Sequence, residues 1–273
     1  MRVKGSMVMR LLVLVWCVAG SISAAAQTVP VVVDFFLDPV GKPYFLLADD
    51  RLVTRNPLGA NTYSWYDSSL GSPDYVDVTN PFQILVYYRD YGTVVVLDRT
   101  LSELDRLDLF GNPAIEQPGV IARSYDNGIW VFDNWAYRLV RLDNRGEVDQ
   151  QTNNLRLELN EPGEPTALFV ARNAVMLYFP DVGRLAEFTN YGQFRRWVEL
   201  PAAEDISWNA PHLLGRGARG GWLWRPGQLA VTPIDGLPET LAAERRILVG
   251  AEGYLTADPT QLGLRVTEFA KKN

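Results

Sequence analysis

The chemistry open to this chain is limited by its histidine and cysteine content. His212 is the only histidine in the 273 residues, and Cys17 is the only cysteine. A zinc or iron site built on histidine needs two or three such ligands, or histidine with cysteine. A Ser-His-Asp triad needs only one histidine, but no G-x-S-x-G elbow accompanies His212, so we expect this side chain to be hydrogen-bonded in a loop. The alternative is a base or pH sensor at a channel mouth.

Oxygen ligands are plentiful, so calcium has to be weighed against a structural role. The side chains in question are Asp49, Asp50, Asp90, Asp126, Asn127, Asp133, Asn134, Asp181 and Asp258. Their spacing is not that of an EF-hand loop. Asp and Asn also favour turns, because their side chains bond the local backbone. We therefore interpret them as turn residues and predict no cofactor, with calcium as the alternative.

Other catalytic arrangements find little support. Glu161, Glu164 and Glu199 supply carboxylates for glycosidic chemistry, but nothing in the sequence brings them to one face. The sequence contains neither a P-loop nor a dinucleotide fingerprint. We predict a protein that is not an enzyme and has no catalytic residues.

The elements that carry these residues recur six times. Each copy has an apolar run, a short polar turn and a second run with alternating apolar residues. The copies are Tyr44–Arg55, Val86–Asp98, Trp130–Asp143, Met176–Thr189, Trp222–Pro233 and Tyr254–Phe269. A strand-rich repeat of roughly 40 to 50 residues is typical of a β-propeller with one four-stranded blade per repeat. The sequence predicts an all-β fold, with a single six-bladed propeller over residues 27–273; five or seven blades are the alternatives.

Blade strands are named a to d from the central channel outward, and the repeated unit is interpreted as strands b and c. The predicted a strands are Val76–Thr79, Val120–Arg123, Thr166–Ala171, Leu213–Gly215 and Ile247–Val249. The predicted d strands include Leu104–Leu109, Leu155–Leu159 and Phe194–Leu200. Alternation of apolar and polar residues in the last two suits an outer strand with one face in solvent.

The b–c turns of a propeller gather around one mouth of the channel, and here they are rich in arginine and aromatic residues. The candidate partner-binding residues are Arg89, Tyr91, Trp135, Tyr137, Arg184 and Arg225. Trp, Tyr and Arg are the types enriched in interface hot spots, so we predict a scaffold that docks a protein partner. The alternative is a carbohydrate-binding or carbohydrate-active propeller, in which Trp135 and Tyr137 face a common pocket.

The segment Trp130–Gly146 (WVFDNWAYRLVRLDNRG), and more loosely Val86–Leu101 and Met176–Gly192, resembles the NHL- and YVTN-type β-propeller superfamily. The resemblance implies a fold and not a function, because the superfamily includes hydrolases, lyases, ligand sensors and scaffolds. It leaves a calcium-dependent hydrolase as a third hypothesis. In size and in its lack of a catalytic signature, the chain is similar to short exported six-bladed members that are accessory parts of bacterial envelope assemblies, including type IX secretion.

The first 26 residues have the features of a cleaved signal peptide. Basic residues precede Leu11–Ala19, an apolar stretch too short to span a bilayer, and Ala24-Ala25-Ala26 is a small-x-small cleavage site. We expect the mature chain to begin at Gln27, to have no transmembrane segment, and to be periplasmic or at the cell surface. Cys17 is removed with the signal peptide, so the mature chain has no thiol.

The charge of the mature chain argues against a nucleic-acid partner. Of the 26 basic residues three lie in residues 1–26, which leaves 23 basic against 32 acidic, a balance of −9. Nucleic-acid binding requires a basic stripe. The predicted partner is a protein of the cell envelope.

One strand-like segment precedes the first repeat. Thr28–Phe36 (TVPVVVDFF) is rich in β-branched and aromatic residues. The sixth repeat lacks a d strand, which would leave the edge of its c strand unpaired. We therefore predict that part of Thr28–Phe36 pairs with Leu262–Ala270 and closes the ring.

Overall fold

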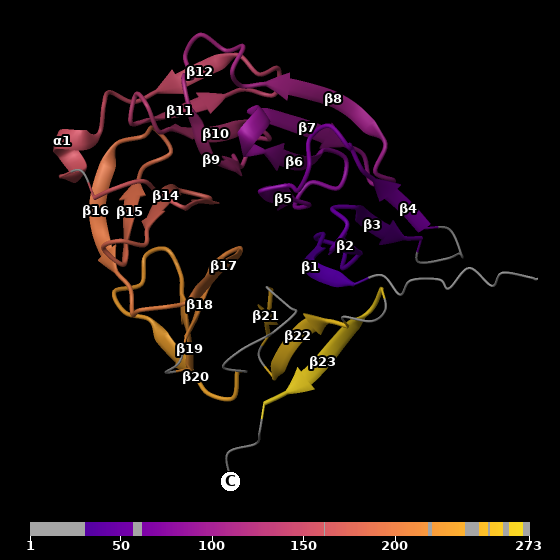
Figure 1. Cartoon of the computed structure of the whole chain (residues 1–273). Helices are drawn as coiled ribbons and strands as arrows, with labels where there is room; N and C mark the ends of the chain where they lie inside the picture. Colours follow the sequence, from indigo (N-terminus) through magenta and orange to yellow (C-terminus); the bar gives the residue numbers. More distant parts are fainter. Residues whose placement is uncertain are drawn as a thin grey trace, which may run out of the picture.

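A computed structural model describes residues 31–56, 62–160, 162–217, 220–237, 246–250, 252–258 and 262–269. In this part of the chain, strands form six antiparallel sheets that stand around a common centre (Figure 1). The fold is an all-β, six-bladed propeller, so the predicted fold class is confirmed. Residues 1–26, where we predict the signal peptide, lie outside the described residues. No helix of the described residues is long and apolar enough to cross a membrane.

The blades follow one another along the chain, with strands in simple sequential order. Blade one contains β1 (Val32–Leu37), β2 (Pro43–Leu47), β3 (Leu52–Arg55) and β4 (Thr62–Trp65). Blade two contains β5 (Tyr75–Asp77), β6 (Ile84–Tyr88), β7 (Thr93–Leu97) and β8 (Glu103–Asp108). Blade three contains β9 (Pro118–Arg123), β10 (Ile129–Asp133), β11 (Arg138–Leu142) and β12 (Val148–Gln151).

The second half of the ring is built in the same way. Blade four contains β13 (Ala167–Ala171), β14 (Ala174–Phe179), β15 (Arg184–Phe188) and β16 (Phe194–Glu199). Blade five contains β17 (Asp205–Asn209), β18 (His212–Gly217), β19 (Gly220–Trp224) and β20 (Thr232–Ile234). Blade six contains β21 (Leu248–Val249), β22 (Gly253–Ala257) and β23 (Leu264–Glu268). Among the described residues, two short helices, η1 (Arg89–Tyr91) and α1 (Arg156–Leu159), lie in loops.

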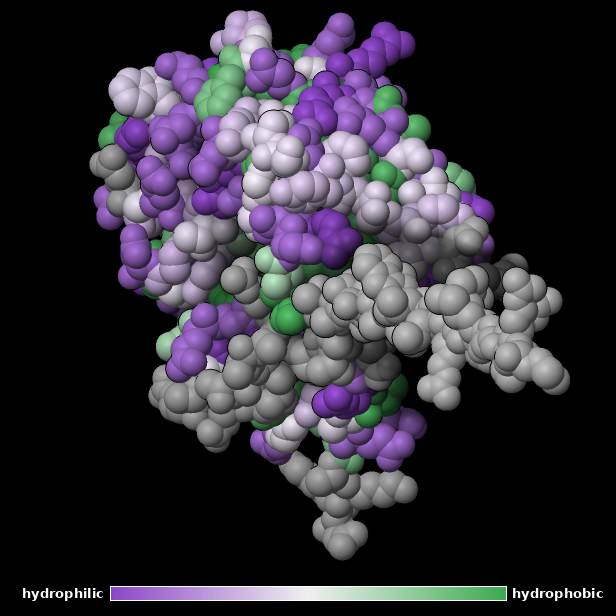
Figure 2. Space-filling view, turned by 45° about the vertical axis from the view of Figure 1, so that its right-hand side comes forward, coloured by the Kyte–Doolittle hydropathy of each residue, from purple (hydrophilic) through white to green (hydrophobic). Residues whose placement is uncertain are grey.

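The core lies between neighbouring blades, because successive side chains of a strand point to opposite faces of its sheet. All five residues of β10 are buried. Ile129 and Val131 enter the cluster shared with blade two, while Trp130 and Phe132 enter the cluster shared with blade four. Strands such as β10 that are buried on both faces therefore read as continuous apolar runs. The surface in Figure 2 is mainly hydrophilic, with hydrophobic residues in small separate patches.

Most of the predicted inner and outer strands overlap observed ones, but blade five is offset by one strand. Leu213–Gly215, predicted as strand a, lies within the second strand β18. The unit Trp222–Pro233 contains strands c and d, so the turn at Pro226 joins those two strands. The true inner strand is β17, DISWN, whose polar residues hide it from a search for apolar runs.

The segment after blade three also differs from the prediction. Leu155–Leu159, predicted as a d strand, forms most of the α1 turn, and the d strand is β12 just before it. Leu155 and Leu159 are both buried in the same cluster. Residues four apart share one face of a helix, so the apolar pair fits a helical turn as well as it fits alternation.

The ring closes by packing and not by the predicted ladder between Thr28–Phe36 and Leu262–Ala270. In the described part of these segments β1 pairs with β2, and β23 pairs with β22. Val32 and Phe35 pack against Leu248 and Ala257 in one cluster between blades one and six. The prediction is wrong for these residues because β1 has buried residues on both faces, which suits an inner strand. Residues 28–30 lie outside the described residues.

Candidate functional site

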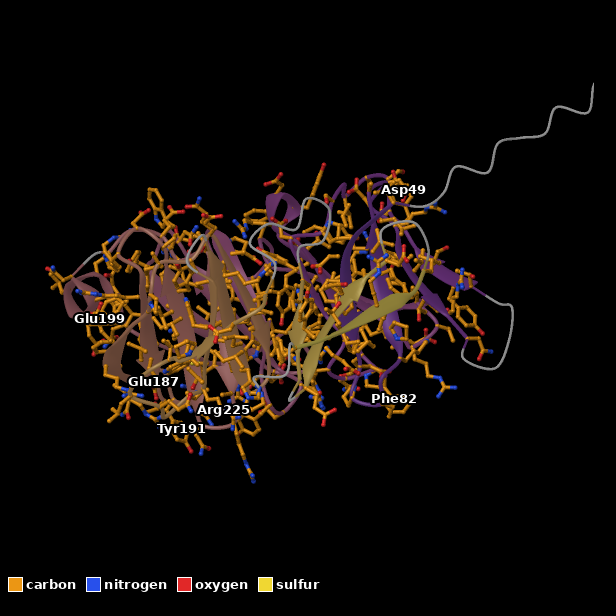
Figure 3. The ribbon with its side chains drawn as sticks, turned by 90° about the horizontal axis from the view of Figure 1, so that it is seen from below. Asp49, Phe82, Glu187, Tyr191, Glu199 and Arg225 are labelled. Carbon is orange, nitrogen blue, oxygen red and sulfur yellow. The ribbon has the colours of Figure 1, made fainter. Side chains whose placement is uncertain are left out.

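The turns define two faces of the propeller. Because adjacent strands run antiparallel, turns between strands b and c share one face with the links between blades. We call it the b–c face. Turns between a and b and between c and d lie on the other, the c–d face. Figure 3 shows Asp49, on the β2–β3 turn, at one edge, and Phe82, Tyr191 and Arg225 at the opposite edge.

Blade two presents two predicted contact residues on the b–c face. Arg89 and Tyr91 belong to η1, which ends at Gly92 in the left-handed conformation. The Arg89 N–H donates to Asp74 Oδ2 at 2.8 Å, and Arg89 Nε lies 3.7 Å from Asp74 Oδ1. Tyr91 is 50% exposed. Phe110, 51% exposed, packs its ring against Gly92, so a second aromatic side chain stands beside Tyr91.

Blade three carries the most exposed aromatic of the predicted set. Trp135 is 66% exposed on the β10–β11 turn. Its carbonyl oxygen accepts from both Arg156 Nη atoms at 3.3 Å, and the next carbonyl, of Ala136, accepts from Asn154 Nδ2 at 2.8 Å. The loop that contains α1 therefore holds this turn through hydrogen bonds to two successive carbonyl oxygens.

The carboxylate of Asp133, which is fully buried at the end of β10, holds the same turn from the core side. Its Oδ1 accepts from the N–H groups of Gln117, Trp135 and Ala136 at 3.1, 3.1 and 3.3 Å, and its Oδ2 accepts from Glu116 N–H at 3.0 Å. Hydrogen bonds from backbone N–H groups to a carboxylate are among the stronger ones in proteins. Asp133 therefore fixes the backbone from which Trp135 projects.

Tyr137, predicted as an exposed contact residue, is only 3% exposed. Its hydroxyl donates to Gly163 O at 2.6 Å, and its ring meets Phe132 edge-on with centroids 5.1 Å apart. The Arg156 guanidinium lies 4.8 Å from the ring centre. The position of Tyr137 on a turn suggests exposure in the sequence. In the structure, its backbone φ of +51° directs the side chain into the core. Tyr137 is a core residue and is not available to a partner.

The last two predicted residues lie on different faces. Arg184 begins β15 on the b–c face, is 43% exposed and pairs with Glu199 through Nε–Oε1 at 2.8 Å. Arg225 follows β19 on the c–d face (Figure 3). Its placement with the other candidates is wrong because blade five is offset by one strand. The structure therefore gathers Arg89, Tyr91, Trp135 and Arg184 on one face of three consecutive blades.

A cavity of about 710 Å³ occupies the centre of the ring and is lined by residues of all six blades. Its carboxylates, Asp34, Asp74, Asp77 and Asp205, form ion pairs with Arg246, Arg89, Arg123 and Arg216 in that order. The Asp77–Arg123 pair is the most enclosed, with Nε–Oδ1 at 3.0 Å. Tyr75 donates to Asp77 Oδ2 at 2.9 Å, and burial raises the pKa of the Tyr75 hydroxyl. This network joins blades two and three.

His212 starts β18 on the c–d face, beside the turn from β17. Burial, together with the nearby positive charge of Arg225, lowers the pKa of His212 below its usual 6.5. His212 therefore begins a strand beside an arginine, whereas the sequence interpretation placed it in a loop.

Several acidic side chains act in turns, as the turn interpretation predicts. Asp49 Oδ1 accepts from Arg51 N–H at 3.4 Å, and Asp126 Oδ1 accepts from Gly128 N–H at 3.4 Å. Glu164 accepts from Asn134 Nδ2 at 3.1 Å. Over the described ranges, no group of three or more His, Cys, Asp or Glu residues is placed to hold a metal ion. Glu161 lies outside these ranges.

Sequence reasoning missed the aromatic side chains of the c–d face. Phe82, Tyr125 and Tyr191 are 68, 64 and 78% exposed. Phe82 and Tyr125 sit on a–b turns joined by a hydrogen bond from Asn80 Nδ2 to Asn127 Oδ1 at 3.0 Å. The signal that could have found Phe82 and Tyr125 is an aromatic residue next to Pro or Asp in the short loops that follow predicted a strands, and Tyr191 lies next to Asn190 in a c–d turn.

The fold and the turn surfaces define this chain as a β-propeller, and solved structures of that class are its structural relatives. One is a catalytically inactive virginiamycin B lyase from Staphylococcus aureus with quinupristin: TM-score 0.58, 12% identity, 89% of this chain and 86% of that one. Another is the Pan2 WD40 domain of Neurospora crassa: TM-score 0.55, 10% identity, 89% and 80%. Such identities establish the fold alone.

A third structure is the extracellular domain of a protein described as a one-component system from B. thetaiotaomicron. It matches with TM-score 0.54 and 12% identity over 87% of this chain and 33% of that one. No protein-family model matches the sequence, and no curated protein matches it. The structural relatives therefore include an enzyme, a WD40 domain and an extracellular domain, and the site itself has to indicate the function.

Proposed function

We propose that this chain is a non-enzymatic, exported β-propeller that docks a protein partner through the b–c face. In this proposal it is an accessory component of a cell-envelope secretion or assembly machinery, such as type IX secretion. The signal-peptide features of residues 1–26 support export. A WD40 domain and an extracellular domain among the structural relatives are compatible with a binding scaffold.

The observation that carries the proposal is Trp135. Large aromatic side chains bury on the order of 150–250 Å² each and dominate interface energetics. Here the ring is 66% exposed although the turn beneath it is fixed by Asp133, Arg156 and Asn154. A fixed backbone loses little conformational entropy on association, so an anchor of this kind binds more tightly than one on a loose loop.

The neighbouring residues have the composition of an interface surface. Tyr91 and Phe110 are both exposed on blade two. Arg89 on blade two and Arg184 on blade four lie on the same face as these aromatic residues. Both arginines already pair with a carboxylate, so they would contribute mainly at a solvated rim, where pairs are worth about 0–1 kcal/mol. The aromatic residues are the expected hot spots.

The test is capture of envelope proteins by the tagged mature chain, residues 27–273. Trp135→Ala is expected to weaken capture by about 2 kcal/mol or more, as hot-spot truncations do. Phe82→Ala and Tyr191→Ala are matched controls, because they remove equally exposed aromatic rings from the c–d face. All three variants should melt like the parent. Capture that depends on Phe82 or Tyr191 but not on Trp135 would place the docking surface on the other face.

A glycan array addresses the carbohydrate alternative. Sugar binding without any stoichiometric protein partner would favour it. The structure supports the carbohydrate alternative less well, because Tyr137 is buried and cannot stack on a sugar beside Trp135.

A further inference from the structure

The outer edge of blade six differs from every other blade in the described part of the chain. In blades one to five strand c is covered by a fourth strand, whereas β23 is the last strand of its sheet. Figure 1 shows β23 as the outermost strand of this blade. Val266, at the centre of β23, is 70% exposed. An uncovered edge presents backbone donors and acceptors to another strand.

Hydrogen bonds at both ends of the β22–β23 ladder show which residues of β23 bond inward. Asp258 N–H donates to Gly263 O at 2.9 Å, and Phe269 N–H donates to Glu252 O at 2.9 Å. Bonded and non-bonded pairs alternate along an antiparallel ladder. Every second residue from Gly263 to Phe269 therefore bonds to β22.

The alternate residues of β23 direct their backbone N–H and C=O groups away from β22. They are Leu264, Val266 and Glu268, which lie opposite Ala257, Leu255 and Gly253 in non-bonded pairs. Their N–H and C=O groups are oriented to pair with a fourth strand. Their side chains share one face of the sheet, because successive side chains alternate between faces.

The sequence of this edge matches that of a strand whose edge is covered. Arg265–Phe269 reads RVTEF, and Arg184–Phe188 in β15 reads RLAEF. In blade four, Leu185 is 0% and Glu187 5% exposed; β16 pairs alongside them, and Leu185 packs against Val198 of β16 and against blade five. Their counterparts in blade six are the exposed Val266 and Glu268.

Blade four shows what kind of strand covers such an edge. β16 runs antiparallel to β15, with Val198 opposite Leu185 and Arg196 opposite Glu187. Arg196 Nε lies 2.9 Å from Glu187 Oε2. The covering strand thus places an apolar residue on the leucine and a guanidinium on the carboxylate.

We propose that the β23 edge binds an extended segment of a partner protein as the fourth strand of blade six. The segment runs antiparallel to β23, with a basic residue opposite Glu268 and an apolar residue opposite Val266. In chain order it reads basic, any residue, apolar. This site is separate from the b–c face, and the two proposals stand or fall independently.

The residues just before β1 do not fit this pattern. Gln27–Val31 reads QTVPV and contains no basic residue. Pro30 has no backbone N–H to donate to a ladder. A segment of another protein matches the chemistry of the edge better.

The probe is an acetylated and amidated peptide that copies Phe194–Leu200 (FRRWVEL), because this sequence covers the equivalent edge of blade four. It is titrated into the mature chain, and binding is followed by amide NMR and amide hydrogen exchange. We expect shifts and new protection at the N–H groups of Leu264, Val266 and Glu268. Arg265 and Thr267, bonded inward, should be protected from the start.

Two variants separate strand addition from general peptide adhesion. Val266→Pro removes an outward N–H and should weaken binding by roughly tenfold, since a hydrogen bond is worth about 0.5–1.5 kcal/mol, while a proline with its missing N–H on the solvent side is tolerated. Thr267→Pro removes an inward bond and should destabilise blade six. Glu268→Lys should weaken binding about fivefold, as expected for an opposed charge pair, and a peptide with Arg196→Glu should restore it.

Three results would overturn the proposal. One is that the outward amides of the peptide-free chain exchange as slowly as the inward ones, which would mean that the edge is already covered. Another is that the peptide leaves the β23 amides unchanged. The third is that it binds Val266→Pro as tightly as the parent. None of these results bears on capture through Trp135.

Discussion

Arg246 Nε lies 3.2 Å from Asp34 Oδ1, which joins the last blade to the first across 212 residues of sequence. The same guanidinium stacks over the Phe36 ring, 4.6 Å from its centre, and its Nη1 lies 3.4 Å from Trp208 O. One side chain therefore connects blades six, one and five at the wall of the central cavity. The apolar cluster of Val32, Phe35, Leu248 and Ala257 completes the seam.

We expect Arg246→Ala to lower the free energy of unfolding by about 1–3 kcal/mol. The pair is partly buried, so its worth lies between that of exposed pairs, about 0–1 kcal/mol, and that of fully buried ones. Urea denaturation of the parent, Arg246→Ala, Asp34→Asn and the double variant gives the coupling energy directly. Arg51→Ala, which breaks an exposed pair with Asp49, is the control and should change stability little. A coupling energy of zero would show that the seam depends on the apolar cluster alone.

How far the fold could be predicted depended on how apolar each strand is. Strands such as β10 and β14 are buried on both faces and read as apolar runs, so the repeat and the blade number followed from the sequence. β17 has Asp, Ser and Asn in an inner strand because it lines a polar cavity. It was missed, and that single omission moved Arg225 to the wrong face.

The sequence identified the residue types of the contact surface, but it did not show which side chains point to solvent and which into the core. Trp135 and Tyr137 lie two residues apart on one turn, yet one is exposed and the other buried. The difference comes from the positive φ of Tyr137 and from the acceptor at Gly163 O, contributed by the next blade link. Neither feature is visible in a local pattern. The open edge of β23 was anticipated, but its relation to β1 required the three-dimensional order of the strands.

Tyr137 and Trp135 should respond to substitution in opposite ways. Tyr137→Ala is expected to destabilise the protein by about 3–5 kcal/mol, as for other large buried aromatic residues. Tyr137→Phe removes only the hydrogen bond to Gly163 O and should be destabilising by about 1 kcal/mol. Trp135→Ala should stay within about 0.5 kcal/mol of the parent. Thermal melts of the three variants measure this. A large loss for Trp135→Ala would mean that this ring supports the fold and is not a free anchor.

Asp133→Asn should loosen the turn that carries Trp135. The amide keeps one oxygen acceptor but turns its NH2 group toward backbone N–H groups that the carboxylate now satisfies. Because hydrogen bonds to charged groups are worth about 1.5–3 kcal/mol, a loss of roughly 2–4 kcal/mol is expected in urea denaturation. Asp143 accepts from the N–H groups of Arg145 and Glu147 on the c–d face. Asp143→Asn is therefore the control, and we expect it to have a smaller effect. Partner capture should fall with Asp133→Asn and not with Asp143→Asn.

His212 gives the protein a stability that declines on the acidic side of neutrality. Burial, and then the charge of Arg225, lowers the pKa of His212 in the folded state below its usual 6.5. The unfolded chain therefore binds a proton more readily, so stability rises with pH through this window and is lost as pH falls below about 6.5. Melting temperatures between pH 5 and 8 should show a steeper acid-side loss for the parent than for His212→Gln.

The same electrostatic relation can be tested on the imidazole itself. Arg225→Ala removes one of the two causes, so an NMR titration should find the His212 pKa higher than in the parent, though still below 6.5 because burial remains. Arg145→Ala, an arginine on the β11–β12 turn of the same face, should leave that pKa unchanged. If Arg225→Ala leaves the pKa where it was, burial alone sets it. The acid-side loss of stability would then be the same in that variant as in the parent.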